Sequence, residues 1–341
     1  MKKIKIFFLK YWLFIFLATI VTILIGFFVK TKIYPSKITE KLLSIPTSKI
    51  ESSSISITPD FSQIEKKIPS FNKNQEVYQI IPSSFSDQEA ILIGEKFGFL
   101  DQPVVSIDNQ GGSVYDWGNQ EKYLSINLRW GSINYRTNPS KKGNLDSLPD
   151  FSQVEKISKD FLDKNGFLPP ESISLKINDI YYINDLGFDL EKVSSSQNAN
   201  LVEVIFGFEI NNKKILNLSA VLGVDSLGKV TYFNCQTTFK EIKLLDYYPL
   251  KTREEIIQTL KTESVINYLY IPNYYAATQE ESKNITSIIF DNIELVYYKF
   301  DPLQSYLQPI FLITGKATLK DGQQGEVGIY LPAIKDEYLL K

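Results

Sequence analysis

The sequence has no histidine, one cysteine and no methionine after Met1. Without histidine there is no Ser-His or Cys-His catalytic pair, and the commonest protein ligand for transition metals is missing. Glycine motifs of serine hydrolases, P-loops and dinucleotide-binding folds are also absent. The single Cys235 cannot form an internal disulfide, and its place in the strand-like run that starts at Val230 predicts a small packing residue.

Two kinds of catalysis remain possible without histidine. A Ser-Lys dyad leaves no local signature, and glycoside hydrolysis needs two carboxyl groups about 5–10 Å apart in a cleft. No motif marks the acids that would serve, the candidates being Asp116, Glu121, Glu203 and Glu294. A calcium loop is disfavoured because Asp179, Asp185 and Asp189 lack the ligand spacing of an EF-hand. We therefore expect no catalytic residues, no cofactor and no metal.

The charges are unevenly distributed along the chain. There are 37 basic and 39 acidic side chains, and the first 32 residues hold six lysines and no acid. Residues 33–341 are therefore left with 31 basic and 39 acidic side chains. A region with this acidic excess lacks a general basic surface, so we expect no nucleic-acid partner.

An uncharged run of nineteen residues extends from Tyr11 to Val29. A helix of this length rises about 1.5 Å per residue and covers roughly 30 Å of hydrocarbon, which predicts a transmembrane helix over residues 11–29. A cleaved signal peptide is the alternative, but the run exceeds the usual apolar region of about 7–15 residues and no A-x-A-like site follows it. The short basic flank, residues 1–10, favours a single pass through the cytoplasmic membrane with the N-terminus inside and residues 33–341 outside.

The part that follows this run divides into a spacer and three units. Residues 30–75 are rich in Ser, Thr, Pro, Ile and Lys, as is typical of a stalk. The units expected after it cover residues 76–148, 149–250 and 251–341. One eight-residue segment occurs twice, since Pro59–Lys66 matches Pro149–Lys156 at seven positions. Because Pro69 interrupts a helix after the first copy only, we interpret the match as chance or a remnant.

Each unit opens with a helix-start signature, a Ser or Thr followed three residues later by Glu. The three pairs are Ser86 and Glu89, Ser152 and Glu155, and Thr252 and Glu255. Strand-like runs rich in Tyr, Ile, Val and Phe follow each helix, among them Val104–Ile107 in the first unit and Ile285–Phe300 in the third, with turn signals such as Asn211-Asn212 between runs. A helix followed by antiparallel strands, repeated about three times, predicts an α+β fold in which helices cover one face of each sheet.

The segment Leu201–Asn217 resembles a strand, turn and strand of the extracytoplasmic YycH/YycI regulators and of PepSY-like domains. The resemblance extends loosely through Asp225–Tyr232, Ile293–Tyr298 and Leu307–Ile313, and it covers about residues 150–335. It implies one N-terminal transmembrane helix, an exported α+β region that engages partners, and no catalytic residues. Phe311 stands where these families commonly have Trp.

Aromatic residues are the candidates for ligand or partner contact. A sugar-stacking platform in the first unit would consist of Tyr115, Trp117, Tyr123 and Trp130. Aromatics at alternating strand positions more often fill a core, which disfavours the platform. Adjacent tyrosines on a strand place one ring on each face, so one of them faces outward. The expected partner contacts are accordingly Tyr297 or Tyr298, whichever faces outward, together with Tyr306 and Phe311.

These observations favour a single-pass, membrane-anchored protein of the cell envelope. Its exported units would bind another envelope protein in a regulatory role, without catalysis, while the bilayer holds residues 11–29. Two alternatives remain open from the sequence. One is a hydrolase that acts on wall or surface polymers through carboxylates, and the other is a purely architectural envelope protein.

Overall fold

The computed structural model describes residues 42–43, 58–82, 84–119, 121–138, 148–186, 190–235, 239–263, 266, 268–270, 285–299 and 304–340. The expected flank at residues 1–10 and the expected transmembrane helix at residues 11–29 lie outside these ranges, as does most of the expected stalk. Within the described ranges, every helix is too short or too polar to cross a bilayer.

The described residues include four α-helices: α2 (Ser62–Lys67), α3 (Asp87–Lys96), α4 (Phe151–Asn165) and α5 (Arg253–Glu263). The strands of the first half are β1 (Leu42–Leu43), β2 (Asn74–Pro82), β3 (Val104–Ile107), β4 (Ser113–Gly118), β5 (Lys122–Asn127), β6 (Ser132–Thr137), β7 (Ile173–Asp185) and β8 (Leu190–Val193). Those of the second half are β9 (Leu201–Ile210), β10 (Lys213–Asp225), β11 (Val230–Cys235), β12 (Phe239–Pro249), β13 (Tyr268–Tyr270), β14 (Ile285–Tyr298), β15 (Tyr306–Leu319), β16 (Gln324–Pro332) and β17 (Leu339–Leu340).

The prediction of a transmembrane helix followed by three successive α+β units is wrong as a description of the fold. Strands β2 to β16 form one mixed, hydrogen-bonded network whose main path is β12-β2-β15-β14-β10-β11-β6-β5-β4-β3. Pairing of β11 with β6 merges the first two expected units, and pairing of β10 with β14 joins the third. The sequence patterns that mark a strand are local, whereas these pairings join distant segments, so the patterns could not reveal them.

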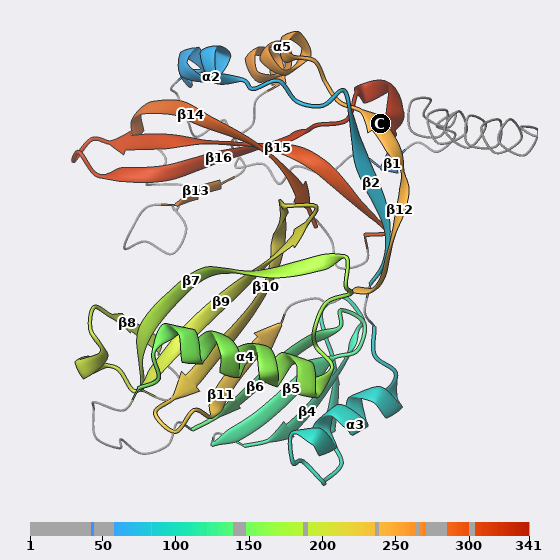
Figure 1. Cartoon of the computed structure of the whole chain (residues 1–341), viewed down its shortest axis with the longest axis vertical. Helices are drawn as coiled ribbons and strands as arrows, with labels where there is room; N and C mark the ends of the chain where they lie inside the picture. The colour runs from blue at the N-terminus through green and yellow to red at the C-terminus, as the bar shows by residue number, and fades with distance from the viewer. Residues whose placement is uncertain are drawn as a thin grey trace, which may run out of the picture.

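The lower lobe in Figure 1, residues 84–235, is a sheet covered by helices on one face. Its strand order is β8-β7-β9-β10-β11-β6-β5-β4-β3, and α4 packs across β9, β10 and β11. Alternate side chains of β9 face this helix and are buried, among them Val204, Phe206 and Phe208. Phe161 of α4 packs edge-on against Phe233 of β11, with ring centroids 5.4 Å apart. This packing forms one core from segments expected in two units.

The upper lobe, residues 58–71 and 250–340, consists of β13 to β16 with α2 and α5 above them (Figure 1). Ile64 of α2 and Ile256 of α5 are completely buried in the core of this lobe. Phe61 stacks on Phe290 of β14, with ring centroids 5.2 Å apart. Residues 58–75, expected as part of the stalk, therefore belong to the folded protein.

The chain enters and leaves the lower lobe through a two-stranded ribbon. From α2 in the upper lobe it descends along β2, and it returns along β12, which pairs antiparallel with β2. A second connection is a short parallel bridge in which Ile215 and Leu216 of β10 pair with Tyr297 and Tyr298 of β14. The lower lobe is thus an insertion within the upper one.

Two of the three predicted helix starts are confirmed. Ser86 and Glu89 form a complete capping box at α3. At α5 the Glu255 N–H donates to Thr252 Oγ1 at 3.2 Å, and the Thr252 N–H donates to Glu255 Oε2 at 2.6 Å. Helix α4 begins earlier than predicted because Asp150, rather than Ser152, accepts the capping hydrogen bond, from the Gln153 N–H at 2.8 Å.

Candidate functional site

Most of the residues expected to contact a partner are in the interior. Tyr297, Tyr298 and Phe311 have exposed fractions of 0%, 5% and 0%, and Tyr306 is half-buried. The expectation that one tyrosine of the pair faces outward fails because both faces of β14 are covered. Tyr297 packs in the core of the lower lobe, and Tyr298 packs in a separate cluster with Ile310. These residues therefore form no exposed aromatic surface.

Tyr297 instead connects β14 to β2. Its hydroxyl donates to the backbone oxygen of Glu76 at 2.9 Å and accepts from Gln75 Nε2 at 2.9 Å. Its ring packs edge-on against Tyr78, with centroids 5.5 Å apart, and the Tyr78 hydroxyl accepts from Asn211 Nδ2 at 2.8 Å. Burial raises the pKa of Tyr297 far above its ordinary value of 10.0. The group is a neutral polar connection from β14 to β2, and Tyr78 of β2 continues it to Asn211 of the lower lobe.

The candidate catalytic acids lie on separate elements. Asp116 lies on β4 and Glu121 in the turn between β4 and β5, whereas Glu203 lies on β9, with β5, β6, β11 and β10 between β4 and β9 in the sheet. Glu294 lies on β14 in the upper lobe, where Lys214 Nζ approaches it to 3.6 Å. Asp185, from the loop considered for calcium, pairs with Arg136 at 2.5 Å. Across the described ranges, no cluster of three acidic or cysteine side chains is arranged to hold a metal ion.

Glu203 is part of a buried polar group that spans three strands. The Tyr232 hydroxyl of β11 donates to the Glu203 carboxylate of β9. The tyrosine ring lies across Gly223 of β10, where an added Cβ would come within 2.2 Å of the ring. Burial raises the pKa of Glu203, and the nearby charge of Lys192 lowers it. With its carboxylate buried and engaged by Tyr232, Glu203 is not available to a substrate.

The aromatics of the expected sugar-stacking platform do not form one surface. Trp117 is buried, and Tyr115 packs edge-on against it with centroids 6.0 Å apart. Tyr123 donates to Asn134 Oδ1 at 3.1 Å from the opposite face of the sheet. Trp130 lies in the loop after β5, where its indole N–H donates to Asp108 Oδ2 at 2.6 Å.

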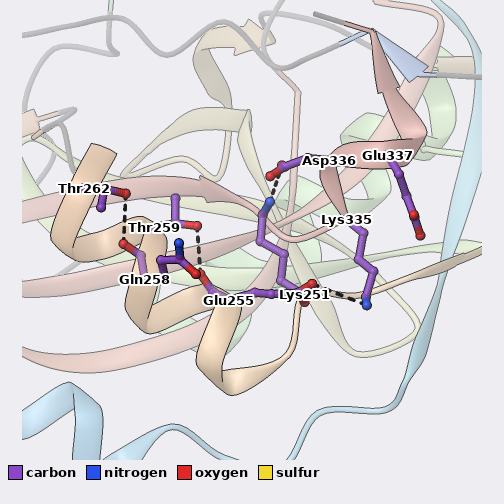
Figure 2. A pocket seen from close by; sticks show the side chains of 8 residues that line it. All are labelled: Lys251, Glu255, Gln258, Thr259, Thr262, Lys335, Asp336 and Glu337. Carbon is purple, nitrogen blue, oxygen red and sulfur yellow. Dashed lines mark hydrogen bonds and ion pairs between the residues drawn. The ribbon is translucent and has the colours of Figure 1, made fainter.

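A polar pocket of about 280 Å³ lies between α5 and the short 3₁₀ turn η4 (Asp336–Tyr338), as Figure 2 shows. Its lining consists of Lys251, Glu255, Gln258, Thr259, Thr262, Lys335, Asp336 and Glu337. Backbone hydrogen bonds hold two of these residues in place. The Lys251 N–H donates to the Ala333 oxygen at 2.8 Å, and the Lys335 N–H donates to the Pro249 oxygen at 3.1 Å.

The charged side chains at the centre of this pocket form ion pairs. Lys251, whose side chain is 4% exposed, pairs with Asp336, and Lys335 Nζ lies 3.4 Å from Glu255 (Figure 2). A hydrogen bond from the Thr252 N–H lowers the pKa of Glu255, with the Lys335 charge acting in the same direction. A carboxylate kept ionised and paired is a poor general acid, so the pocket is better suited to holding charge than to proton transfer.

The two threonines of the pocket are engaged with their own helix. Thr259 Oγ1 donates to the Glu255 oxygen at 2.8 Å, and Thr262 Oγ1 donates to the Gln258 oxygen at 3.0 Å (Figure 2). Each hydroxyl therefore directs its proton to the preceding turn of α5 rather than into the pocket. This arrangement shows no hydroxyl activated by a neighbouring base.

A different kind of site lies at the end of the lower sheet. Strand β3 pairs with β4 and ends the strand path, so its other edge is unpaired among the described residues. All four residues of β3 are exposed, and Val104, Val105 and Ile107 have exposed fractions of 71%, 56% and 74%. The sequence predicted this strand, but neither its edge position nor its exposure could be read from a run of four residues.

The backbone of β3 is oriented for a further strand. The Asp108 N–H donates to the Gly112 oxygen at 2.8 Å, which makes the pair Ile107 and Ser113 a non-hydrogen-bonded pair. Hydrogen-bonded and non-hydrogen-bonded pairs alternate in an antiparallel ladder. The N–H and C=O groups of Val105 and Ile107 therefore point away from β4, toward the unpaired edge.

No family model matches the chain, and no curated protein matches it. The comparisons thus leave the resemblance to YycH/YycI regulators and PepSY-like domains without support. Among solved structures, the chain is similar to an uncharacterized protein from Eubacterium rectale ATCC 33656, with a TM-score of 0.44 and 11% sequence identity. The match covers 76% of this chain and 82% of that one.

Proposed function

We propose that the folded part of this protein is a non-catalytic binding module that captures an extended segment of another envelope protein by strand addition to β3. The observation that carries the proposal is the unpaired edge of β3 with its exposed Val104, Val105 and Ile107. Soluble proteins usually protect such edges with charges, proline or a covering element. An apolar edge strand with free backbone groups is the template used in strand addition.

Strand β3 offers both interactions that strand addition uses, which are main-chain hydrogen bonds and apolar side-chain contacts. The outward N–H and C=O groups of Val105 and Ile107 supply main-chain hydrogen bonds, which bind any extended sequence. The exposed valine and isoleucine side chains add burial of apolar area, which favours a partner segment with apolar residues at alternate positions. The partner is therefore expected to present a short, extended and apolar segment.

The absence of catalysis is part of this proposal and rests on the geometry of the polar groups. The polar pocket has its central charges in ion pairs, and Glu203 is buried against Tyr232. Neither arrangement offers a carboxyl group and a reactive partner facing a common open cleft.

The location of the protein is proposed from the sequence. The uncharged run from Tyr11 to Val29 and the lysines on both sides of it favour attachment to the cytoplasmic membrane, with residues 33–341 outside. Protease added outside spheroplasts should digest the folded part while leaving a cytoplasmic marker intact. Full protection from protease would contradict this location.

Photo-crosslinking in cells tests the binding site. A photoreactive amino acid at Ile107 of the full chain should give a discrete adduct with one envelope protein. The Val105→Pro substitution removes an outward N–H without breaking a hydrogen bond to β4, so it should abolish the adduct. The Val105→Thr substitution keeps that N–H and should retain most of it.

Leu227 supplies the matched control, because it is 76% exposed but lies in the turn between β10 and β11. A photoreactive residue at position 227 should give no such adduct. An Ile107 adduct that persists in Val105→Pro would contradict strand addition. An adduct with twice the mass of the chain would show that the partner is a second copy and would contradict a different envelope protein.

A further inference from the structure

A second pocket, of about 580 Å³, adjoins the polar pocket of Figure 2 and shares Lys251 and Lys335 with it. It lies between the chain segment that links α2 to β2 and the segment that links β12 to α5. Four of its lining residues are cationic and none is acidic, although the chain has a net charge of −2. The cations are Lys73, Lys251, Arg253 and Lys335. Such a local excess of positive charge favours an anionic ligand.

Backbone hydrogen bonds fix the relative positions of the cationic segments. The Leu250 N–H donates to the Lys73 oxygen at 2.9 Å, and Leu250 forms an antiparallel bridge with Ile334. The Lys335 N–H in turn donates to the Pro249 oxygen at 3.1 Å. Three distant segments are thus held together, so the cations need little rearrangement to meet a ligand.

Only part of this positive charge is neutralised within the protein. Lys251 pairs with Asp336 and Lys335 with Glu255, both on the side of the neighbouring pocket. Among the described residues, no carboxylate lies within 4.0 Å of Lys73 or of the Arg253 guanidinium. One guanidinium nitrogen of Arg253 donates to the backbone oxygen of Glu65 at 2.5 Å, which orients the group and leaves its other donors for a ligand. Two cations remain without a carboxylate partner.

The rest of the lining is partly apolar. Ile68 and Phe71 are half-buried and pack against the core of the upper lobe. The Phe71 ring lies 4.8 Å from that of Phe311, which fixes its position. A ligand in this pocket would therefore meet cations on one side and a firm apolar wall on the other.

We propose that this pocket binds a phosphate group, held by Arg253 and Lys73 together with the shared lysines. Guanidinium groups bind phosphate oxygens through paired, charge-assisted hydrogen bonds. A phosphate monoester carries a charge of about −1.5 to −2 at neutral pH, which matches the two cations that have no carboxylate partner. The phosphate belongs to a free phosphate compound or to a lipid headgroup; the headgroup phosphate is a diester with less charge, and the same cations bind the oxygens of both.

Two probes test the proposal and separate the sources. Purified full-length protein is titrated with inorganic phosphate by calorimetry, and it is tested for flotation with vesicles of phosphatidylglycerol and of phosphatidylcholine. Saturable phosphate binding supports a free phosphate compound, and saturable binding to phosphatidylglycerol vesicles alone supports a headgroup. Binding to neither probe would overturn the proposal.

Matched variants exclude a general effect of charge. Arg253→Gln should weaken binding of the responding probe at least tenfold, and Arg253→Lys should restore part of the loss. Lys243→Gln removes the same charge from an exposed position on β12 outside the pocket and should leave binding unchanged. Equal weakening in the Arg253 and Lys243 variants would overturn the proposal. Arg253 and Lys243 are exposed, so circular dichroism should confirm an intact fold in each variant.

Discussion

The Tyr297→Phe substitution tests whether the buried hydroxyl joins β14 of the upper lobe to β2 of the ribbon. It removes one oxygen atom and keeps the ring, so the edge-on packing against Tyr78 at 5.5 Å is retained. Two hydrogen bonds are lost, one donated to the Glu76 backbone oxygen and one accepted from Gln75 Nε2. The experiment therefore isolates the polar contact from the packing.

The expected cost follows from what each former partner can do next. Gln75 Nε2 keeps a second acceptor, the Glu76 carboxylate at 3.1 Å, so the free energy lost at this donor is small. The Glu76 backbone oxygen loses the tyrosine donor in a partly buried place, which costs about 1–3 kcal/mol. The free energy of unfolding should fall by roughly 1.5–3 kcal/mol in total, and the melting temperature by about 3–8 °C.

Thermal and urea unfolding of the full chain measure this change. Tyr270→Phe is the matched control, because Tyr270 is 54% exposed and should tolerate loss of its hydroxyl within about 0.5 kcal/mol. A Tyr297→Phe protein as stable as the control would refute the argument that this hydroxyl connects β14 to β2.

Three further predictions concern other parts of the structure. Burial raises the pKa of Glu203 above 4.5, so the free energy of unfolding of the wild type should decline as the pH rises from about 4.5 through that raised pKa. Urea unfolding across pH 4–8 should show no such decline for Glu203→Gln, and a variant with the same pH profile as the wild type would contradict the prediction. Gly223→Ala would place a Cβ within 2.2 Å of the Tyr232 ring and should cost about 1–3 kcal/mol or more, so a melting temperature equal to wild type would contradict the close approach. Asp150→Ala should lower the free energy of unfolding by about 1 kcal/mol through loss of the α4 cap, whereas Ser152→Ala should change it little. A larger loss of melting temperature in Ser152→Ala than in Asp150→Ala would favour Ser152 as the cap, as the sequence predicted.

Local chemistry explains which parts of the fold could be predicted from the sequence. Capping boxes depend on residues three positions apart, so Ser86 with Glu89 and Thr252 with Glu255 were visible in the sequence. The repeated segment shows the same dependence on near neighbours. After Pro59–Lys66 the helix α2 ends at Lys67, before Pro69, whereas the second copy lies in the longer α4. Proline two residues further on stops the first helix.

Strand pairing could not be predicted, because it depends on contacts between distant segments. The sequence identified the run from Ile285 to Phe300, yet nothing in it indicates that Tyr297 pairs with Ile215 of β10 or hydrogen-bonds to Glu76. Alternation along β14 correctly implies two faces for the adjacent tyrosines. The inference that one face meets solvent was wrong, because the lower-lobe core covers one face and a small cluster around Ile310 covers the other.

The candidate sites likewise combine features that nearby residues predict with features that depend on distant segments of the chain. The β3 strand was predicted from its own residues, but its exposed edge exists because the path of paired strands ends there. The basic pocket gathers Lys73, Arg253 and Lys335 from three separate parts of the chain. A search for charge runs could not find it, since no two of these residues are sequence neighbours.

The insertion of one lobe into the other gives the two proposed sites separate structural supports. The basic pocket is built on the upper lobe, where Leu250 and Ile64 share one hydrophobic core. The β3 edge belongs to the lower lobe, whose strands pack under α4 around a different core. The lobes meet through the β2–β12 ribbon and the short bridge between β10 and β14. Because sites with no shared contacts usually act additively, occupation of the pocket should leave the β3 edge free to bind, and we expect one chain to bind a phosphate group and a partner strand at the same time.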